Sequence, residues 1–325
     1  MFEAKKIVTT LVKIIIGVLS LGIIYYKLKA DFTADKIAIL YSILFTVKGV
    51  VCIILCLLLI PINWGIESYK WKIITQPVEE ISFKTAMQSV YSGVCLGNLA
   101  PGRATEFIAK IYFFKIENRS QIAVLHFVGG MFQLAISIVF GLVALFFKFK
   151  NFNADNVWIA YLVSVLAVVV FGFFVLCLFK LPKILAFVYK KISKQKNINS
   201  GFNYVFTKSQ LFKLIAFSTI RYFVFSVQLF LLLFLFYQGP FSLQIVFGIW
   251  LYFLIVSIVP MISFIEAAIR AAVALIVFKD CGISNAALAL ASILIWILNI
   301  VVPSIAGYFI LIKQNFNFKI SKQKK

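Results

Sequence analysis

The sequence NLAPGRATEFIAK, residues 98–110, lies inside a long apolar region and carries features that an uninterrupted membrane helix lacks. Pro101 and Gly102 should break a helix here, because proline has no backbone N–H to donate and its ring clashes with the preceding turn. Asn98 places a polar side chain just before this break. The stretch therefore predicts two helical segments that meet at a break, rather than one continuous span.

Three charged side chains follow the break. Arg103, Glu106 and Lys110 are spaced by three and four residues, so they share one face of the helix that restarts there. The N-terminus of that helix also directs backbone N–H groups toward the break, where they favour an anion. We therefore expect these three side chains, with the three residues at the break, to bind a substrate.

A second stretch, residues 259–270, repeats the pattern late in the chain. Pro260 is followed by Glu266 and then by Arg270, so both stretches read proline, glutamate and, four residues later, a base. In each stretch the acid can pair with the base that follows it, or with a base of the other stretch. This pair of broken, charged segments is the best indication of function, and Glu266 and Arg270 join the candidate substrate-binding residues.

The composition places the chain in a membrane. Of its 325 residues 63% are hydrophobic and the mean hydropathy is +1.03, more apolar surface than a soluble protein can bury. The formal charge of +21 does not indicate nucleic-acid binding, because the lysines gather in short loops and near the two ends of the sequence. No Cys or His cluster has the spacing of metal ligands, so we expect no metal, no cofactor and no catalytic residue.

Six apolar runs are long enough to span a bilayer: residues 7–28, 37–60, 122–147, 157–180, 211–237 and 284–312. Two further apolar regions, 85–115 and 243–279, contain the broken stretches. The predicted fold is a single all-α integral membrane domain over residues 1–325. It has about six full spans and two broken or re-entrant helical hairpins.

The basic residues predict the orientation. Residues 181–210 are rich in lysine and contain no acidic residue, which indicates a cytoplasmic loop. Counting spans outward from this loop places both termini in the cytoplasm, in a bacterial-type cell membrane. The two broken stretches then enter from opposite sides. Residues 37–180 and 211–312 are accordingly predicted to be two halves of an inverted repeat, a plan found in many transporters.

Residues 62–72, INWGIESYKWK, lie between the span at 37–60 and the first broken stretch. Tryptophan, tyrosine and lysine are typical of the membrane–water interface. We interpret this segment as an interfacial anchor.

Seven ionisable residues fall within apolar segments: Lys48, Arg103, Glu106, Lys110, Arg221, Glu266 and Arg270. Each costs roughly 2.5–3.5 kcal/mol at the bilayer centre unless it is paired or hydrated. Five bases face two acids, so ion pairs alone leave a surplus of positive charge. That surplus predicts a site for a phosphate or carboxylate, which arginine holds through two hydrogen bonds.

Two later helices carry polar faces that would suit a cavity. Arg221 lies on one face with Ser218 and Gln228, and Asn299 lies on another with Ser292 and Trp296. We expect Arg221 and Asn299 to line the path of the substrate. The alternative is that such residues only join helices to one another.

At these residues the sequence resembles the transmembrane, flippase-like domain of lysylphosphatidylglycerol synthases. Residues 98–106 are similar to the family's Pro-Gly-Arg-x-Gly-Glu motif, and residues 260–266 stand where the family has a second segment ending in glutamate. The tryptophan-bearing residues 63–72 match an aromatic and basic segment of the family. The resemblance covers about residues 37–312. Thr105 replaces a glycine of the first motif, and the second motif lacks its usual glycines.

The resemblance implies a lipid transporter that moves a phospholipid or lipid-linked headgroup, anionic or aminoacylated, between leaflets. The family's aminoacyl-transferring domain is not expected here, so synthase activity is not carried over. The substrate would be a membrane phospholipid or glycolipid, and a lipid-synthesis enzyme would be a partner. No ATP-binding motif is present, so an ion gradient, a partner or the lipid gradient would supply the energy. Two alternatives stay open: a membrane-embedded lipid-modifying enzyme, and a non-transporting scaffold of a lipid-synthesis complex.

Overall fold

The computed structural model describes residues 41–98, 105–150, 180–192, 206–237, 242–259 and 265–314, together with a few single positions. Over these residues the chain consists of helices and the turns between them, with no strand. Apart from single positions, the expected spans at 7–28 and 157–180 lie outside the described residues. So do the two proline-containing breaks, residues 99–104 and 260–264.

Four described helices are long and apolar enough to cross a membrane. They are α3 (Val47–Thr75), α6 (Arg119–Lys150, preceded by the short η2, Ile116–Asn118), α9 (Lys208–Phe236) and the continuous run of α12 (Asn285–Trp296), η4 (Ile297–Val301) and α13 (Val302–Lys313). A helix of this length extends roughly 43 Å, which exceeds a hydrocarbon core about 30 Å thick. The chain is therefore an all-α, multi-pass membrane protein.

Helix α3 is longer than the sequence predicted. It begins after Thr46, whose side chain accepts a hydrogen bond from the backbone N–H of Gly49, and it continues through Pro61 instead of ending at residue 60. A proline is tolerated inside a membrane helix, because neighbouring helices and side chains satisfy the carbonyl that loses its donor.

This extension overturns the interpretation of residues 62–72 as an interfacial anchor. They form the second half of α3, and Asn63, Trp64, Lys70 and Trp71 are all buried. Aromatic and basic side chains are typical of interfaces, but most of those in this segment are buried against other helices. The segment belongs to the core of the protein.

Both broken stretches form two helices. α4 (Phe83–Gly97) is followed by α5 (Glu106–Tyr112), and α10 (Leu243–Ile258) is followed by α11 (Glu266–Val277). The second stretch is interrupted although it lacks glycine. Val259 has the extended conformation that a residue before proline prefers, and this ends α10.

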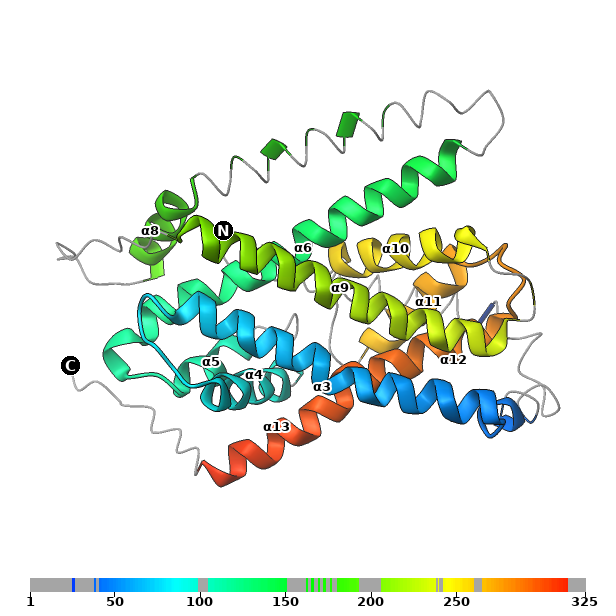
Figure 1. Cartoon of the computed structure of the whole chain (residues 1–325), viewed down its shortest axis with the longest axis horizontal. Coiled ribbons are helices and arrows are strands. Elements are labelled where there is room, and N and C mark those ends of the chain that lie inside the picture. Colours follow the sequence, from blue (N-terminus) through cyan, green and yellow to red (C-terminus); the bar gives the residue numbers. More distant parts are fainter. Residues whose placement is uncertain are drawn as a thin grey trace.

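Helices α3 and α9 lie side by side and run in opposite directions (Figure 1). Near the start of α3, the amine of Lys48 donates to the backbone carbonyl of Phe234 at the end of α9, at 2.8 Å. Near the end of α3, the ring of Tyr69 packs edge-on against Phe217 near the start of α9. The two helices thus contact each other along most of their length.

Two other contacts mirror each other across this central pair. α4 packs against α13, and α10 packs against α6 (Figure 1). Each depends on a glycine: a Cβ on Gly307 of α13 would lie 2.1 Å from the carbonyl oxygen of Tyr91, and one on Gly141 of α6 would lie 2.4 Å from Cβ of Leu254. Small residues allow such close helix approach in membranes.

The basic segment 181–210 begins with a helix, α8 (Leu181–Ile192). Leu181 and Leu185 are buried against the rest of the protein, and Lys183 is exposed. The first part of the expected loop is therefore an amphipathic helix.

Candidate functional site

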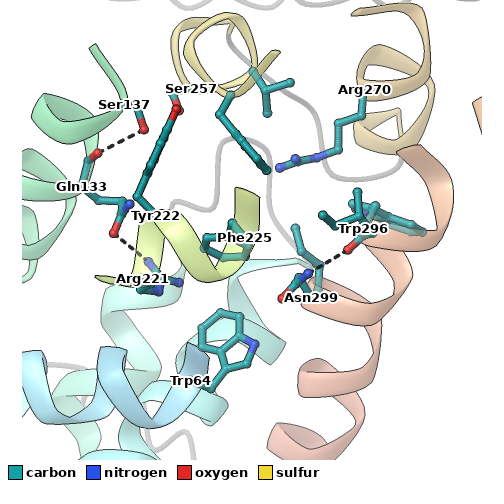
Figure 2. Close-up of a pocket in the computed structure, with 14 residues that line it drawn as sticks. Trp64, Gln133, Ser137, Arg221, Tyr222, Phe225, Ser257, Arg270, Trp296 and Asn299 are labelled. Carbon is teal, nitrogen blue, oxygen red and sulfur yellow. Dashed lines mark hydrogen bonds between the residues drawn. The ribbon is translucent and has the colours of Figure 1, made fainter. Parts of the chain in front are cut away.

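A cavity of about 230 Å³ lies between α3, α6, α9, α10, α11 and the last helix (Figure 2). Its polar lining consists of Gln133, Ser137, Arg221, Tyr222, Ser257, Arg270 and Asn299. Its aromatic lining consists of Trp64, Phe225, Phe253 and Trp296. Within the described part of the chain the lining includes two arginines and no carboxylate.

Arg221, on α9, is fixed by contacts on several sides. Its Nε donates to Oδ1 of Asn63 at 3.0 Å, and one terminal nitrogen donates to Oε1 of Gln133 at 3.4 Å. The same terminal nitrogen lies 3.2 Å from Oε2 of Glu67. The guanidinium also lies over the ring of Trp64, 5.3 Å from its centroid, a distance at which a cation is attracted to an aromatic face.

Glu67 is shared between two bases. Besides Arg221, its carboxylate lies 3.3 Å from the amine of Lys70, a side chain with no exposed surface. Burying charges is expensive unless each is well paired. One carboxylate cannot neutralise both cations, so this cluster carries a surplus positive charge beside the cavity.

A series of hydrogen-bonded, buried carboxamide side chains begins at Asn63, which accepts from Arg221. Nδ2 of Asn63 donates to Oδ1 of Asn299, Nδ2 of Asn299 donates to Oε1 of Gln228, and Nε2 of Gln228 donates to the backbone oxygen of Cys56, each at 3.0 Å. Asn299 belongs to η4, a π-helical turn, and such turns occur frequently at functional sites. These hydrogen bonds fix the orientation of the carboxamide groups of Asn63, Asn299 and Gln228.

Arg270, on α11, lies on the other side of the cavity from Arg221 (Figure 2). Its Nε and one terminal nitrogen both donate to Oε1 of Glu266, at 3.1 and 2.7 Å. Of the two pairings left open by the sequence, the structure describes the local one, between residues four apart. Arg270 is 17% exposed and Glu266 is 6% exposed.

The first stretch forms a second ion pair at a separate place. The amine of Lys110 lies 2.8 Å from the carboxylate of Glu106, again four residues apart. Lys110 is 3% exposed and its amine lies 5.1 Å from the ring centroid of Trp71, whose indole N–H donates to Ser89. Neither charged residue of this pair lines the cavity.

Asn98, just before the first break, also does not line the cavity. Asn98 ends α4, and its side-chain nitrogen donates to the hydroxyl of Ser304 on α13. The expected substrate-binding residues Pro101, Gly102 and Arg103 lie outside the described residues. The structure therefore brings together Arg221, Arg270 and Asn299 of the ten residues predicted from the sequence.

Three hydrogen-bond donors at the cavity have no partner within the described part of the chain: Nε1 of Trp64, the hydroxyl of Tyr222 and Nε1 of Trp296. Trp64 is 4% exposed and Tyr222 is 2% exposed. A buried donor without a partner costs about 1–3 kcal/mol. Water or a ligand in the cavity would satisfy all three.

The sequence contained a signal for the missed residues Asn63, Glu67 and Lys70. Their spacing of four and three residues puts them on one helix face. A prediction of an interfacial anchor for this segment does not use that spacing. Gln133 gave no such signal, since it is a single polar residue in an apolar helix.

No protein-family model matches the chain, and no curated protein matches it. Among the described residues, no group of three or more His, Cys, Asp or Glu side chains could hold a metal ion.

Proposed function

We propose that the protein is a lipid transporter that moves a phospholipid or lipid-linked headgroup between the leaflets of a bacterial-type cell membrane. The observation that carries this proposal is a cavity within the membrane domain that two arginines and three unpartnered donors line. Its volume of about 230 Å³ is just below the usual range of ligand pockets, about 300–1,000 Å³. A space of this size suits a headgroup whose acyl chains stay in the bilayer.

We further infer about six full spans and two broken hairpins, arranged as an inverted repeat with both termini in the cytoplasm. Corresponding helix starts recur 160 or 161 positions apart: Thr46 and Thr207, Ser82 and Ser242, and Glu106 and Glu266. The antiparallel contact of α3 with α9, and the mirrored contacts of α4 with α13 and α10 with α6, agree with this plan.

Transporters built in this way bind their substrate at the interface between the repeats and rock one repeat against the other. In the proposed repeat the cavity would lie at such a place, since α3 and α6 of the first half and α9, α10 and α11 of the second all contribute to it. The resemblance of the two broken stretches to a flippase-like domain supports the same function.

The test is lipid movement in vesicles. The purified protein is reconstituted in liposomes, and the movement of labelled lipids between leaflets is compared for wild type, Arg221→Gln and Lys48→Gln. Arg221→Gln leaves Glu67 paired with Lys70, so no buried carboxylate loses all its partners. Lys48→Gln is the matched control, because it removes a cation from α3 that is exposed and distant from the cavity lining.

We expect Arg221→Gln to slow movement at least tenfold, because hydrogen bonds to a charged group contribute about 1.5–3 kcal/mol and 1.4 kcal/mol is a factor of ten. The control should stay within about twofold of wild type. Failure of the folded wild-type protein to move any lipid, with an ion gradient of either direction imposed, would contradict the proposal.

A further inference from the structure

We infer that the cavity binds an anionic phosphate group that carries no amine, so that an aminoacylated headgroup is a poor ligand. This inference rests on the proposed function and narrows its substrate class. It comes from the hydrogen-bonding capacity that the cavity leaves unused, from the surplus charge beside it and from the use of its aromatic faces.

The three buried polar atoms of the lining without partners in the described part of the chain can all donate a hydrogen bond. The indole N–H groups of Trp64 and Trp296 can only donate, and the hydroxyl of Tyr222 can donate or accept. With the two guanidinium groups, they surround a space that an acceptor-rich group would fill. The oxygens of a phosphate diester are acceptors only, so they match this lining.

Within the described part of the chain no carboxylate lines the cavity, and its carboxamide oxygens already accept hydrogen bonds. Oδ1 of Asn299 accepts from Asn63, and Oε1 of Gln133 accepts from Arg221. The carboxylates that pair with the cavity arginines are Glu67, which is shared with Lys70, and Glu266. An ammonium group has three N–H donors and no acceptor, so the lining offers it neutral hydroxyl groups and no negative charge.

Two aromatic rings of the lining already face a cation. Rings of tryptophan, tyrosine and phenylalanine can form a cage for a cation. Here the guanidinium of Arg221 lies 5.3 Å from the ring centroid of Trp64 and 5.0 Å from that of Phe225. A ligand ammonium at these two rings would have to displace Arg221, and at the other rings of the lining the two guanidinium groups would repel it.

The charge balance favours a single negative charge. Lys70 and Arg221 share one carboxylate, that of Glu67, whereas Arg270 has its own, that of Glu266. The five side chains together carry one excess positive charge. A phosphodiester, which has one negative charge, would neutralise it.

The test measures binding to the full-length protein in detergent micelles by titration calorimetry. The probes are short-chain phosphatidylglycerol, its lysyl ester, glycerol phosphate and inorganic phosphate. The first two share one phosphodiester and differ in the amines. We expect phosphatidylglycerol to bind at least tenfold more tightly than its lysyl ester.

A triple variant tests the three donors. Trp64→Phe, Trp296→Phe and Tyr222→Phe each remove a donor and keep an aromatic ring. Together they should weaken phosphatidylglycerol binding roughly tenfold or more, because three hydrogen bonds to the phosphate are lost at once. Trp250→Phe is the matched control, since Trp250 packs against Phe140 outside the cavity lining and should leave affinity unchanged.

The outcomes separate this inference from the proposed function. Equal or tighter binding of the lysyl ester, or equal effects of the triple and control variants, overturns the inference, while movement of lipids in vesicles would still support transport. Absence of binding by every phosphate probe also overturns it. Binding of glycerol phosphate or inorganic phosphate as tight as that of the lipid supports the phosphate site and contradicts the lipid as its source.

Discussion

The two broken stretches have the same sequence pattern and different surroundings. In both, a glutamate begins the second helix and pairs with the base four residues later, at 2.8 Å between Glu106 and Lys110 and 2.7 Å between Glu266 and Arg270. Lys110 is almost fully covered, whereas Arg270 reaches the cavity. A repeated motif therefore fixes the local ion pair without fixing whether that pair meets a ligand.

Neighbouring residues cause the difference. In the first stretch, α5 lies so close to α4 that a Cβ on Gly93 would be 2.9 Å from Cγ of Lys110, and Trp71 covers the amine. In the second, Arg270 extends away from its helix with a planar guanidinium that can bind two oxygens at once. The first pair lies within α5 and is covered by α4 and by Trp71 of α3, whereas the base of the second pair lines the cavity.

The largest expected effect is the loss of stability on substituting Glu67, whose carboxylate pairs with two basic side chains. Glu67→Gln keeps the shape of the side chain but leaves Arg221 and Lys70 buried without a counter-charge. It should lower the free energy of unfolding by about 3–5 kcal/mol, the usual cost of breaking a buried ion pair. Denaturant unfolding in mixed micelles would measure this. Glu80→Gln, an exposed control, should change the value by less than about 0.5 kcal/mol.

Variants that remove both charges of one ion pair distinguish the role of the Glu106–Lys110 pair from that of the Glu266–Arg270 pair. Glu106→Gln with Lys110→Met, and Glu266→Gln with Arg270→Met, remove both charges of one pair, which is often nearly neutral for stability. We expect lipid movement within about twofold of wild type for the first double variant. The second should lose at least tenfold, about 1.4 kcal/mol of substrate interaction. Equal rates for the two would show that the asymmetry has no functional meaning.

The smallest expected effect on stability comes from a substitution on α4, where α4 contacts the ion pair of the first stretch. Gly93→Ala adds a methyl group where the flexible side chains of Lys110 and Glu106 have to give way. Overpacking of this kind costs about 1–3 kcal/mol, and we expect the lower end because long side chains can move. Lipid movement should be unchanged. A loss of transport without a loss of stability would mean that the first stretch takes part in binding after all.

The sequence predicted the features that depend on near neighbours. The two breaks follow from Pro101 and Pro260, and the two ion pairs follow from a spacing of four residues, so both could be derived locally. The contact of Glu67 with Arg221 could not, because it joins residues on different helices. The composition of residues 62–72 also led to a wrong prediction for the surroundings of Glu67, since tryptophan and lysine occur at interfaces as well as around buried polar sites.

The π-helical turn η4 lets the last span hold one residue more than a regular helix would. α12 packs against α9 and α11, whereas α13 packs against α4. A π-helical turn closes i→i+5 hydrogen bonds and therefore contains one residue more than an α-helical turn. Removing one residue from η4 would leave an α-helical turn and keep Gly307 facing the carbonyl of Tyr91, whereas removing one from α13 ahead of Gly307 would turn it away by about 100°. The number of residues between Val302 and Gly307 is therefore constrained more tightly than the number of residues in η4.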